Sequence, residues 1–233
     1  MKNTLLILTL LASIPSFGQS HKFRLGVTLN AGLTDNFLSN DGSVPDVVAT
    51  TFKNSEKSTL GYAAHAFAQY PASARLKLQL GIGYAKTGFD TPKRALVFEV
   101  PEPSGLKYIK FEFSHHNITL PLQARYNFSK KKNTFYLMGG ITPLFKLKRS
   151  KTITSWYADG GKKRKTEEDT ITSYRTVNFN GSIGIGYDLK VAKRMNLFFQ
   201  PTFDFNLLGV SKSASLNRRI YSMGLSVGLI FGS

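Results

Sequence analysis

The chain has 233 residues, no cysteine and a formal net charge of +17. The absence of cysteine excludes a disulfide framework and a thiolate metal site. The length suits a single all-β domain, since sandwiches and barrels often reach this size as one unit.

The first 18 residues have the composition of a cleaved secretory signal peptide. Lys2 provides a positive charge, residues 5–11 form a short apolar run, and Ser16-Phe17-Gly18 places small residues at a cleavage site. We therefore expect a mature domain over residues 19–233. Because an exported protein rarely meets nucleic acid, the basic balance predicts lipopolysaccharide and lipid headgroups as anionic partners, and no nucleic acid.

Eight segments of the mature chain alternate apolar and polar residues with a period of two, which is typical of a β-strand that faces two environments. The last segment is the clearest, because large apolar residues alternate there with serine and glycine. In chain order the predicted strands lie at residues 21–31, 60–70, 76–84, 118–128, 135–141, 177–189, 197–207 and 221–231.

Short and long connections alternate between these segments. Residues 71–75, 129–133 and 191–195 are short connections, whereas the long ones are 34–59, 88–107, 149–173 and 209–218. This layout predicts a closed antiparallel barrel of eight transmembrane strands, monomeric, in the outer membrane of a Gram-negative bacterium. We expect short periplasmic turns, long extracellular loops and periplasmic termini.

Two of the long connections contain turn sequences flanked by strand-like residues. The segments 101–105 and 159–161 predict two β-hairpins, which prolong the third and fourth strands and the fifth and sixth strands beyond the membrane. The apolar phase changes between Phe113 and Ile118. This change predicts a β-bulge at His115-His116-Asn117.

The interior of an eight-stranded barrel is just wide enough to be filled by side chains. We expect its polar residues to pair with one another and to close the lumen, because an unpaired buried charge is costly. The predicted inward residues are Arg24, His65, Gln79, Arg125, Asp188, Gln200 and Asp204. The aromatic residues predicted to form girdles at the two membrane interfaces are Tyr70, Tyr84, Tyr126, Phe128, Phe135, Tyr187, Phe198 and Tyr221.

The tip of the second predicted hairpin carries the candidate residues for partner binding. Trp156 and Tyr157 precede the Asp-Gly turn, and the basic run Lys162, Lys163, Arg164 and Lys165 follows it. Exposed aromatic residues favour a sugar ring or a partner protein, and the basic run favours lipopolysaccharide phosphates. Alternatively, the acidic residues 167–169 neutralise the basic run and the hairpin is simply solvated.

The one candidate for catalysis is Ser114 with His115 or His116, near the predicted outer rim, which would suit a lipid-modifying enzyme. Adjacent histidines in a strand point to opposite faces, which disfavours both a catalytic set and a metal site. We therefore expect no catalytic residues, no metal and no cofactor. A third hypothesis, a soluble periplasmic lipocalin-like binder, requires apolar residues inside the barrel and polar residues outside.

The stretch Asn117–Phe128, which has a proline after an apolar residue in mid-strand, and the following Tyr136–Gly140 resemble the PorT-like outer-membrane β-barrel family. Glycine-rich segments at 25–33 and 182–187 fit the same family. The resemblance implies a small outer-membrane barrel of the cell envelope without shared catalytic residues. Since the family's namesake is needed for protein secretion across the outer membrane, the resemblance adds an envelope or secretion-system protein to the expected partners.

Overall fold

The computed structural model describes residues 23–97, 105–131, 133–169 and 174–232. The predicted signal peptide at residues 1–18 lies outside these ranges, as does most of the predicted turn at 101–105. Within them, no helix is long and apolar enough to cross a membrane.

The described residues form one antiparallel sheet and a short helix. The elements are β1 (Arg24–Asn40), α2 (Asp46–Asn54), β2 (Thr59–Pro71), β3 (Leu76–Asp90), β4 (Arg94–Ala95), β5 (Leu106–Thr119), β6 (Leu122–Asn127), β7 (Thr134–Tyr157), β8 (Lys162–Glu168), β9 (Val177–Ala192), β10 (Met195–Asn206) and β11 (Leu216–Phe231).

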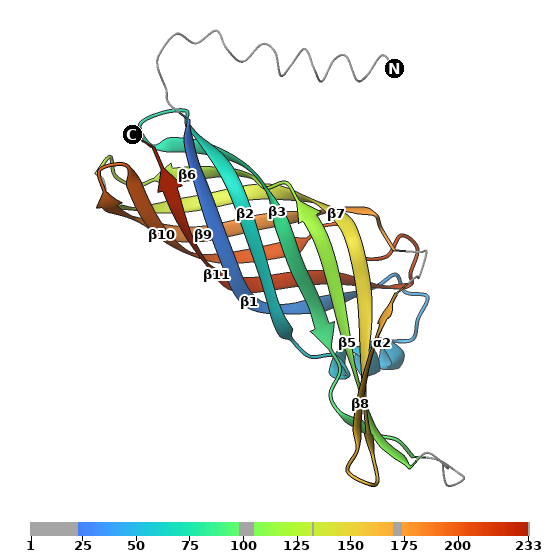
Figure 1. Cartoon of the computed structure of the whole chain (residues 1–233). Coiled ribbons are helices and arrows are strands. Elements are labelled where there is room, and N and C mark those ends of the chain that lie inside the picture. The colour runs from blue at the N-terminus through green and yellow to red at the C-terminus, as the bar shows by residue number, and fades with distance from the viewer. Residues whose placement is uncertain (1–22, 98–104, 132, 170–173, 233) are drawn as a thin grey trace, which may run out of the picture.

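The sheet closes into a barrel with eight strand positions (Figure 1). Around the ring, β2 is followed by β1, β11, β10, β9, β7, β6 and β3, and β3 pairs again with β2. The strand predicted fourth in chain order is formed by β6 and β5 together, which both lie between β3 and β7. Pro121 lacks a backbone N–H and interrupts the ladder between them. The eight-stranded barrel is confirmed, with its fourth strand broken in two.

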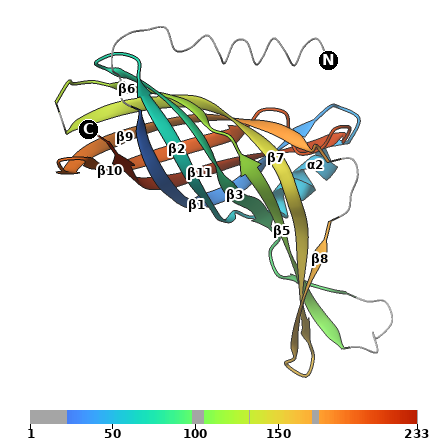
Figure 2. The ribbon, with the colours of Figure 1, turned by 45° about the horizontal axis from the view of Figure 1, so that its top comes forward.

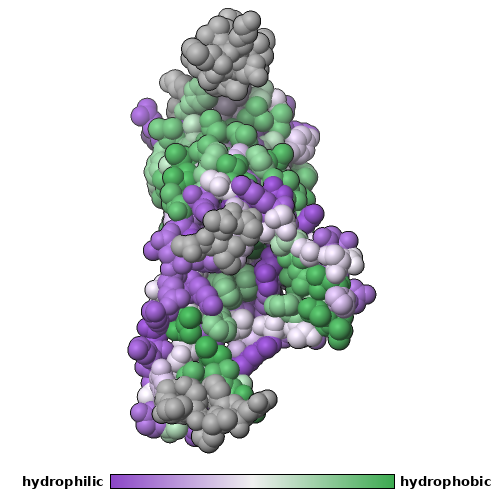
Figure 3. All heavy atoms as spheres, turned by 90° about the vertical axis from the view of Figure 1, so that its right-hand side faces the viewer, coloured by the Kyte–Doolittle hydropathy of each residue, from purple (hydrophilic) through white to green (hydrophobic). Residues whose placement is uncertain are grey.

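The wall of the barrel is apolar outside and polar inside. On β11, for example, Met223 is 62% exposed, whereas Ser226 is 8% exposed. Hydrophobic residues cover the part of the barrel nearest the chain termini in Figure 3. A soluble lipocalin-like binder needs the reverse arrangement, so the structure argues against that alternative.

Aromatic residues face outward at both ends of this apolar band. The ring pairs nearer the termini are Phe23–Tyr70 and Phe135–Tyr187. At the opposite end are the pair Tyr62–Tyr84 and Tyr221, whose ring packs against Phe203 of the apolar band. The girdle prediction is wrong for Phe198, which is 1% exposed and lies in the lumen. Phe198 occupies an inward position on β10, opposite Gly228 on β11, whose missing side chain leaves room for the ring.

An arm of four strands projects from the end of the barrel opposite the termini (Figures 1 and 2). The pairing of β5 with β7 continues from Thr119 opposite Leu144 to Leu106 opposite Tyr157, and β4 and β8 flank this pair. The two predicted hairpins are present as the pairings of β4 with β5 and of β7 with β8. Because β5 and β7 are neighbours in the barrel, their extensions continue the same ladder, and the two hairpins merge into one arm.

A β-bulge lies at the predicted position along the β5–β7 ladder, but its extra residue is on β7 and not on β5. The register between β5 and β7 shifts between His116 and Asn117, whose partners are Lys148 and Lys146. Leu147 is the extra residue on β7.

The connection predicted as a long loop at 34–59 contains ordered structure that the sequence did not indicate. β1 continues to Asn40, and α2 has Asp46 in its first turn and Lys53 in its last, charges that suit the helix dipole. Glu56, just after α2, binds Arg218 of β11 at 2.6 Å. This ion pair fixes the end of the helix against the barrel mouth.

Candidate functional site

A buried polar cluster closes the barrel lumen. Arg125 is 1% exposed, and its guanidinium donates a hydrogen bond to Gln200 Oε1 at 3.1 Å. The same guanidinium lies 4.2 Å from the ring centre of Phe198 and 4.6 Å from that of Tyr136. Tyr136 in turn donates its hydroxyl to Gln200 Oε1 at 2.9 Å. The cation is thus held between aromatic faces and an amide oxygen.

Asp188 provides the carboxylate of this cluster. Its Oδ2 lies 3.2 Å from Lys77 Nζ, and its Oδ1 lies 3.9 Å from Arg125 Nη1. The pairing expected among Arg125, Asp188 and Gln200 is confirmed. Sequence reasoning did not include Lys77 in this set, and it assigned Phe198 to the outside. We call these residues the lumen plug: Lys77, Arg125, Tyr136, Asp188, Phe198 and Gln200.

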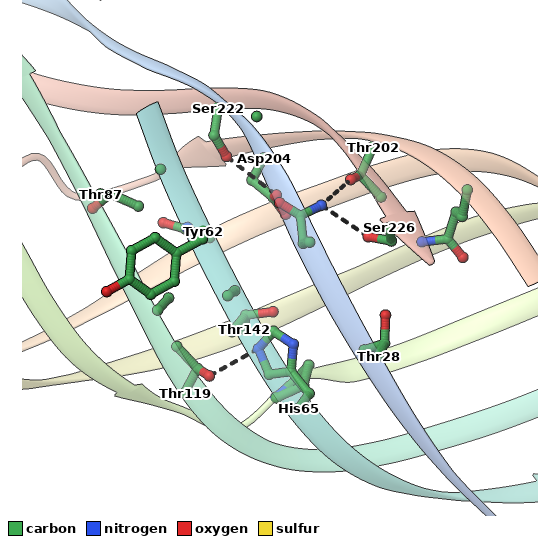
Figure 4. Close-up of a pocket in the computed structure, with 18 of the residues that line it drawn as sticks. Thr28, Tyr62, His65, Thr87, Thr119, Thr142, Thr202, Asp204, Ser222 and Ser226 are labelled. Carbon is green, nitrogen blue, oxygen red and sulfur yellow. Dashed lines mark hydrogen bonds between the residues drawn. The ribbon is translucent and has the colours of Figure 1, made fainter. Parts of the chain in front are cut away.

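A polar pocket of about 90 Å³ lies above the lumen plug (Figure 4). Asp204 accepts hydrogen bonds from the hydroxyls of Ser182 and Ser222. On a neighbouring wall, His65 Nε2 is 2.9 Å from Thr119 Oγ1. The inward positions predicted for His65 and Asp204 are confirmed. The pocket is lined with hydroxyl and amide groups, which suit ordered water.

Within the described residues, no group of three histidine, cysteine, aspartate or glutamate side chains could hold a metal ion.

The structure separates the residues of the suggested rim catalytic set. His115 is buried and lines the lumen, whereas His116 hydrogen-bonds the hydroxyl of Tyr84 on the outside of the barrel. In the described part of the chain, neither histidine is hydrogen-bonded to Ser114. Neither histidine is therefore placed to activate Ser114 as a nucleophile.

The arm carries a surface in which lysines lie over aromatic rings. Trp156 on β7 stands opposite Tyr108 on β5 and Lys162 on β8. Lys93 Nζ lies 4.2 Å from the ring centre of Tyr108 and 4.6 Å from that of Trp156. Lys162 Nζ approaches Trp156 to 5.6 Å. We call Lys93, Tyr108, Trp156 and Lys162 the aromatic–basic patch.

The alternation of the strands divides the residues predicted for partner binding between two faces of the arm. Lys162 and Arg164 lie on the face of Trp156, whereas Tyr157, Lys163 and Lys165 occupy the alternate positions. The predicted residues therefore do not form one continuous surface.

The predicted self-neutralisation of the basic run is only partial. Arg164 pairs with Glu112 at 2.6 Å, and Lys165 pairs with Glu167 at 2.7 Å. Over the described residues, Lys162 and Lys163 take part in no salt bridge. The two lysines nearest the turn are thus available to an external anion.

Ion pairs along the arm hold the patch in place. Lys110 Nζ lies 2.8 Å from Asp90 and 3.1 Å from Glu112, which also pairs with Arg164. Partial burial acts to raise the pKa of Glu112, but the hydrogen bonds and charges of Lys110 and Arg164 outweigh it and lower that pKa. The hydrogen bond to Asp90 raises the pKa of Lys110. Both groups are therefore ionised at neutral pH.

The turn at the tip of the arm has the expected chemistry. Gly160 has a φ of +85°, a conformation that favours glycine, and the N–H of Gly161 donates to Asp159 Oδ1 at 2.8 Å. Sequence reasoning found this turn but not Lys93 and Tyr108. These two residues are far from Trp156 in the sequence, and only the pairing of β5 with β7 brings them to it.

Comparisons with known proteins agree with the fold. The family model of the outer membrane protein beta-barrel domain matches residues 17–214. A search of curated proteins found no match.

Several solved structures resemble the chain at low sequence identity. Neisserial surface protein A is 13% identical, with a match over 90% of this chain and 97% of that one and a TM-score of 0.43. A major outer membrane protein from Thermus thermophilus is 13% identical, over 91% and 99% of the chains, with a TM-score of 0.43. The outer membrane protease OmpT from Escherichia coli is 8% identical, over 91% and 94%, with a TM-score of 0.37.

Proposed function

The chain belongs to the outer membrane protein beta-barrel domain family, and we propose that it is a non-enzymatic accessory protein of the cell envelope that contacts lipopolysaccharide through the arm. It is an outer-membrane β-barrel of a Gram-negative bacterium. In this proposal the barrel is a monomeric anchor, and the aromatic–basic patch is the contact surface.

The observation that carries this proposal is the geometry of the patch. Trp156 and Tyr108 present amphipathic rings, which suit sugar rings. Lys93 and Lys162 lie beside these rings, and Lys162 forms no salt bridge within the described residues, so both charges can meet phosphate groups. The patch lies on the arm, beyond the apolar band (Figure 1), and in the proposed orientation this is the side of the membrane that carries lipopolysaccharide.

Replacing Trp156 by alanine is expected to weaken binding to lipopolysaccharide-containing vesicles by about 2- to 12-fold, because the lost contact of the indole ring with a sugar ring is expected to contribute roughly 0.5–1.5 kcal/mol, as other aromatic ring contacts do. Binding is measured by co-sedimentation of the purified barrel with vesicles that contain or lack lipopolysaccharide. The matched control is Tyr157→Ala, which removes an aromatic ring from the alternate position of the same strand and should bind as the wild type does. Equal binding by both variants would contradict the proposed contact surface.

The proposal also places the arm outside the cell and the termini in the periplasm, as in barrels with short periplasmic turns. Because the chain has no cysteine, a single introduced thiol reports its own side of the membrane. A membrane-impermeant maleimide is expected to label Lys163→Cys on intact cells and to label Lys130→Cys only after the outer membrane is permeabilised. The opposite pattern would reverse the orientation and remove the arm from the cell surface.

The resemblance to PorT-like proteins suggests a second occupant for the same patch, an envelope or secretion-system protein. A photo-cross-linking residue placed at Trp156 distinguishes the two occupants in cells. Cross-links to lipopolysaccharide support the proposal, whereas a discrete protein adduct would replace lipopolysaccharide with a protein partner.

A further inference from the structure

A small cavity lies in the mouth of the barrel, directly above the pocket shown in Figure 4. Thr87, Asn180 and Ser222 line both spaces. The upper cavity has a volume of about 30 Å³ and is lined in addition by His115, Arg149 and Arg175. We call it the mouth cavity.

The basic residues of the mouth cavity have nitrogen atoms without hydrogen-bond partners. Arg149 is 7% exposed, and its Nε and Nη1 atoms are unpartnered. Arg175 Nε and both ring nitrogens of His115 are likewise buried and unpartnered. Buried polar groups in folded proteins are normally satisfied, so three unpartnered arginine nitrogens, beside an imidazole with one N–H donor and one acceptor nitrogen, indicate that something else in the cavity binds them.

The position of Arg149 is fixed by its neighbours. It stands opposite His115 in the ladder between β7 and β5, on the inward face. Its guanidinium lies 3.9 Å from the ring centre of Tyr174, which covers one face of the group. The edges of the guanidinium, where the N–H groups are, remain to contact a ligand in the cavity.

Acidic residues near the mouth neutralise this cluster only in part. No aspartate or glutamate is found among the described residues that line the mouth cavity. Glu56 is paired with Arg218. Asp169 interacts electrostatically with Arg149 and forms a hydrogen bond with Tyr174. Arg175 therefore adds positive charge without an acidic partner of its own on the cavity wall.

We propose that the mouth cavity binds a phosphate group. A guanidinium edge matches two phosphate oxygens, and this charge-assisted pairing is among the stronger hydrogen-bonding arrangements in proteins. Asn178 and Asn206 also line the cavity and add amide groups. With roughly 10–15 Å³ needed for each water molecule, the cavity of about 30 Å³ holds about two or three of them, which leaves room for one phosphate group.

The phosphate is either free in solution or borne by a lipid whose headgroup reaches the barrel mouth. The site is independent of the aromatic–basic patch, since the two share no residue. Failure of one proposal therefore leaves the other intact.

The test uses the full mature barrel in detergent and measures binding of inorganic phosphate by isothermal titration calorimetry. Arg149→Gln is expected to weaken binding by about 10- to 100-fold, as expected for loss of a charged hydrogen-bond donor. The matched control is Lys148→Gln, which removes the same charge from the adjacent, exposed residue and should bind phosphate as the wild type does. Arg175→Gln provides a second variant, and faster gel migration before boiling confirms that each variant is a closed barrel.

A parallel titration with vesicles of phosphorylated and dephosphorylated lipid A separates the two sources of phosphate. Binding of inorganic phosphate that depends on Arg149 supports a site for the free anion, and Arg149-dependent binding of phosphorylated lipid alone supports a lipid-borne group. Absence of binding in both titrations, or equal binding by wild type and the arginine variants, would overturn the proposal. Trp156→Ala should leave phosphate binding unchanged, which distinguishes this site from the patch.

Discussion

Replacing Asp188 by alanine is expected to lower the free energy of unfolding of the barrel by about 3–5 kcal/mol, because it breaks a buried ion pair by removing one partner. Asp188 is the carboxylate of the lumen plug, and both Lys77 and Arg125 are ion-paired with it. Its loss leaves the buried cations Lys77 and Arg125 without an ion-pair partner among the described residues. The measurement is urea-induced unfolding of the refolded barrel, followed by the loss of heat-modifiable gel migration.

Two further variants test whether the broken ion pair causes the loss of stability. Glu167→Ala also removes a carboxylate from a salt bridge, the one with Lys165, but on the exposed strand β8, and it should leave barrel stability unchanged. Adding Lys77→Met to Asp188→Ala should restore part of the loss, because one of the unpaired cations is then removed. A loss below about 1 kcal/mol for Asp188→Ala, against the 3–5 kcal/mol expected, would show that the plug is held by packing and not by charge.

The barrel itself could be predicted from the sequence because its pattern is local. Every second residue of a strand meets lipid, so the alternation in segments such as 221–231 records both the strand and its orientation. The change of apolar phase between Phe113 and Ile118 predicted a bulge on the fourth strand, whereas the extra residue is Leu147 on the partner strand β7. Interior positions such as Arg125 and Asp188 followed from the same period of two.

The features that the sequence did not indicate depend on contacts between distant residues. Phe198 has the same inward phase as Gln200, but its place near a strand end led to a girdle assignment; contacts with Arg125 and Phe67, from other strands, give its ring a place in the lumen. The aromatic–basic patch needs Lys93 and Tyr108 from segments that precede the strand of Trp156 in the chain. No local sequence pattern indicates such contacts, because they depend on the strand order and on the register of the arm.

The residues of the mouth cavity could not be grouped from the sequence either. In the sequence, His115 and Arg149 are ordinary basic residues of separate segments, and no spacing rule for catalytic or metal-binding residues joins them. The register of β5 with β7 places them opposite each other on the inward face. Their significance as a cluster follows from burial and missing hydrogen-bond partners, which only three-dimensional structure reveals.

Replacing Ile183 by arginine is expected to destabilise the barrel in a lipid bilayer by about 2–4 kcal/mol, the cost of a charged residue on the lipid-facing wall near the midplane. Ile183 is 55% exposed and lies about halfway along the outward residues of β9, opposite Phe203 of β10. An arginine there must either enter the hydrocarbon or distort the membrane to reach water. Unfolding in vesicles, compared between variant and wild type, measures the effect.

The matched control places the same arginine on an apolar residue outside the band. Val47 on α2 is 72% exposed and lies at the mouth end of the molecule, so Val47→Arg should leave stability unchanged within about 0.5 kcal/mol. The contrast between the two variants separates lipid exposure from surface exposure in general. If both arginines were tolerated equally, Ile183 would face water and not hydrocarbon, and the exposed apolar wall would not be the membrane-facing surface of the barrel.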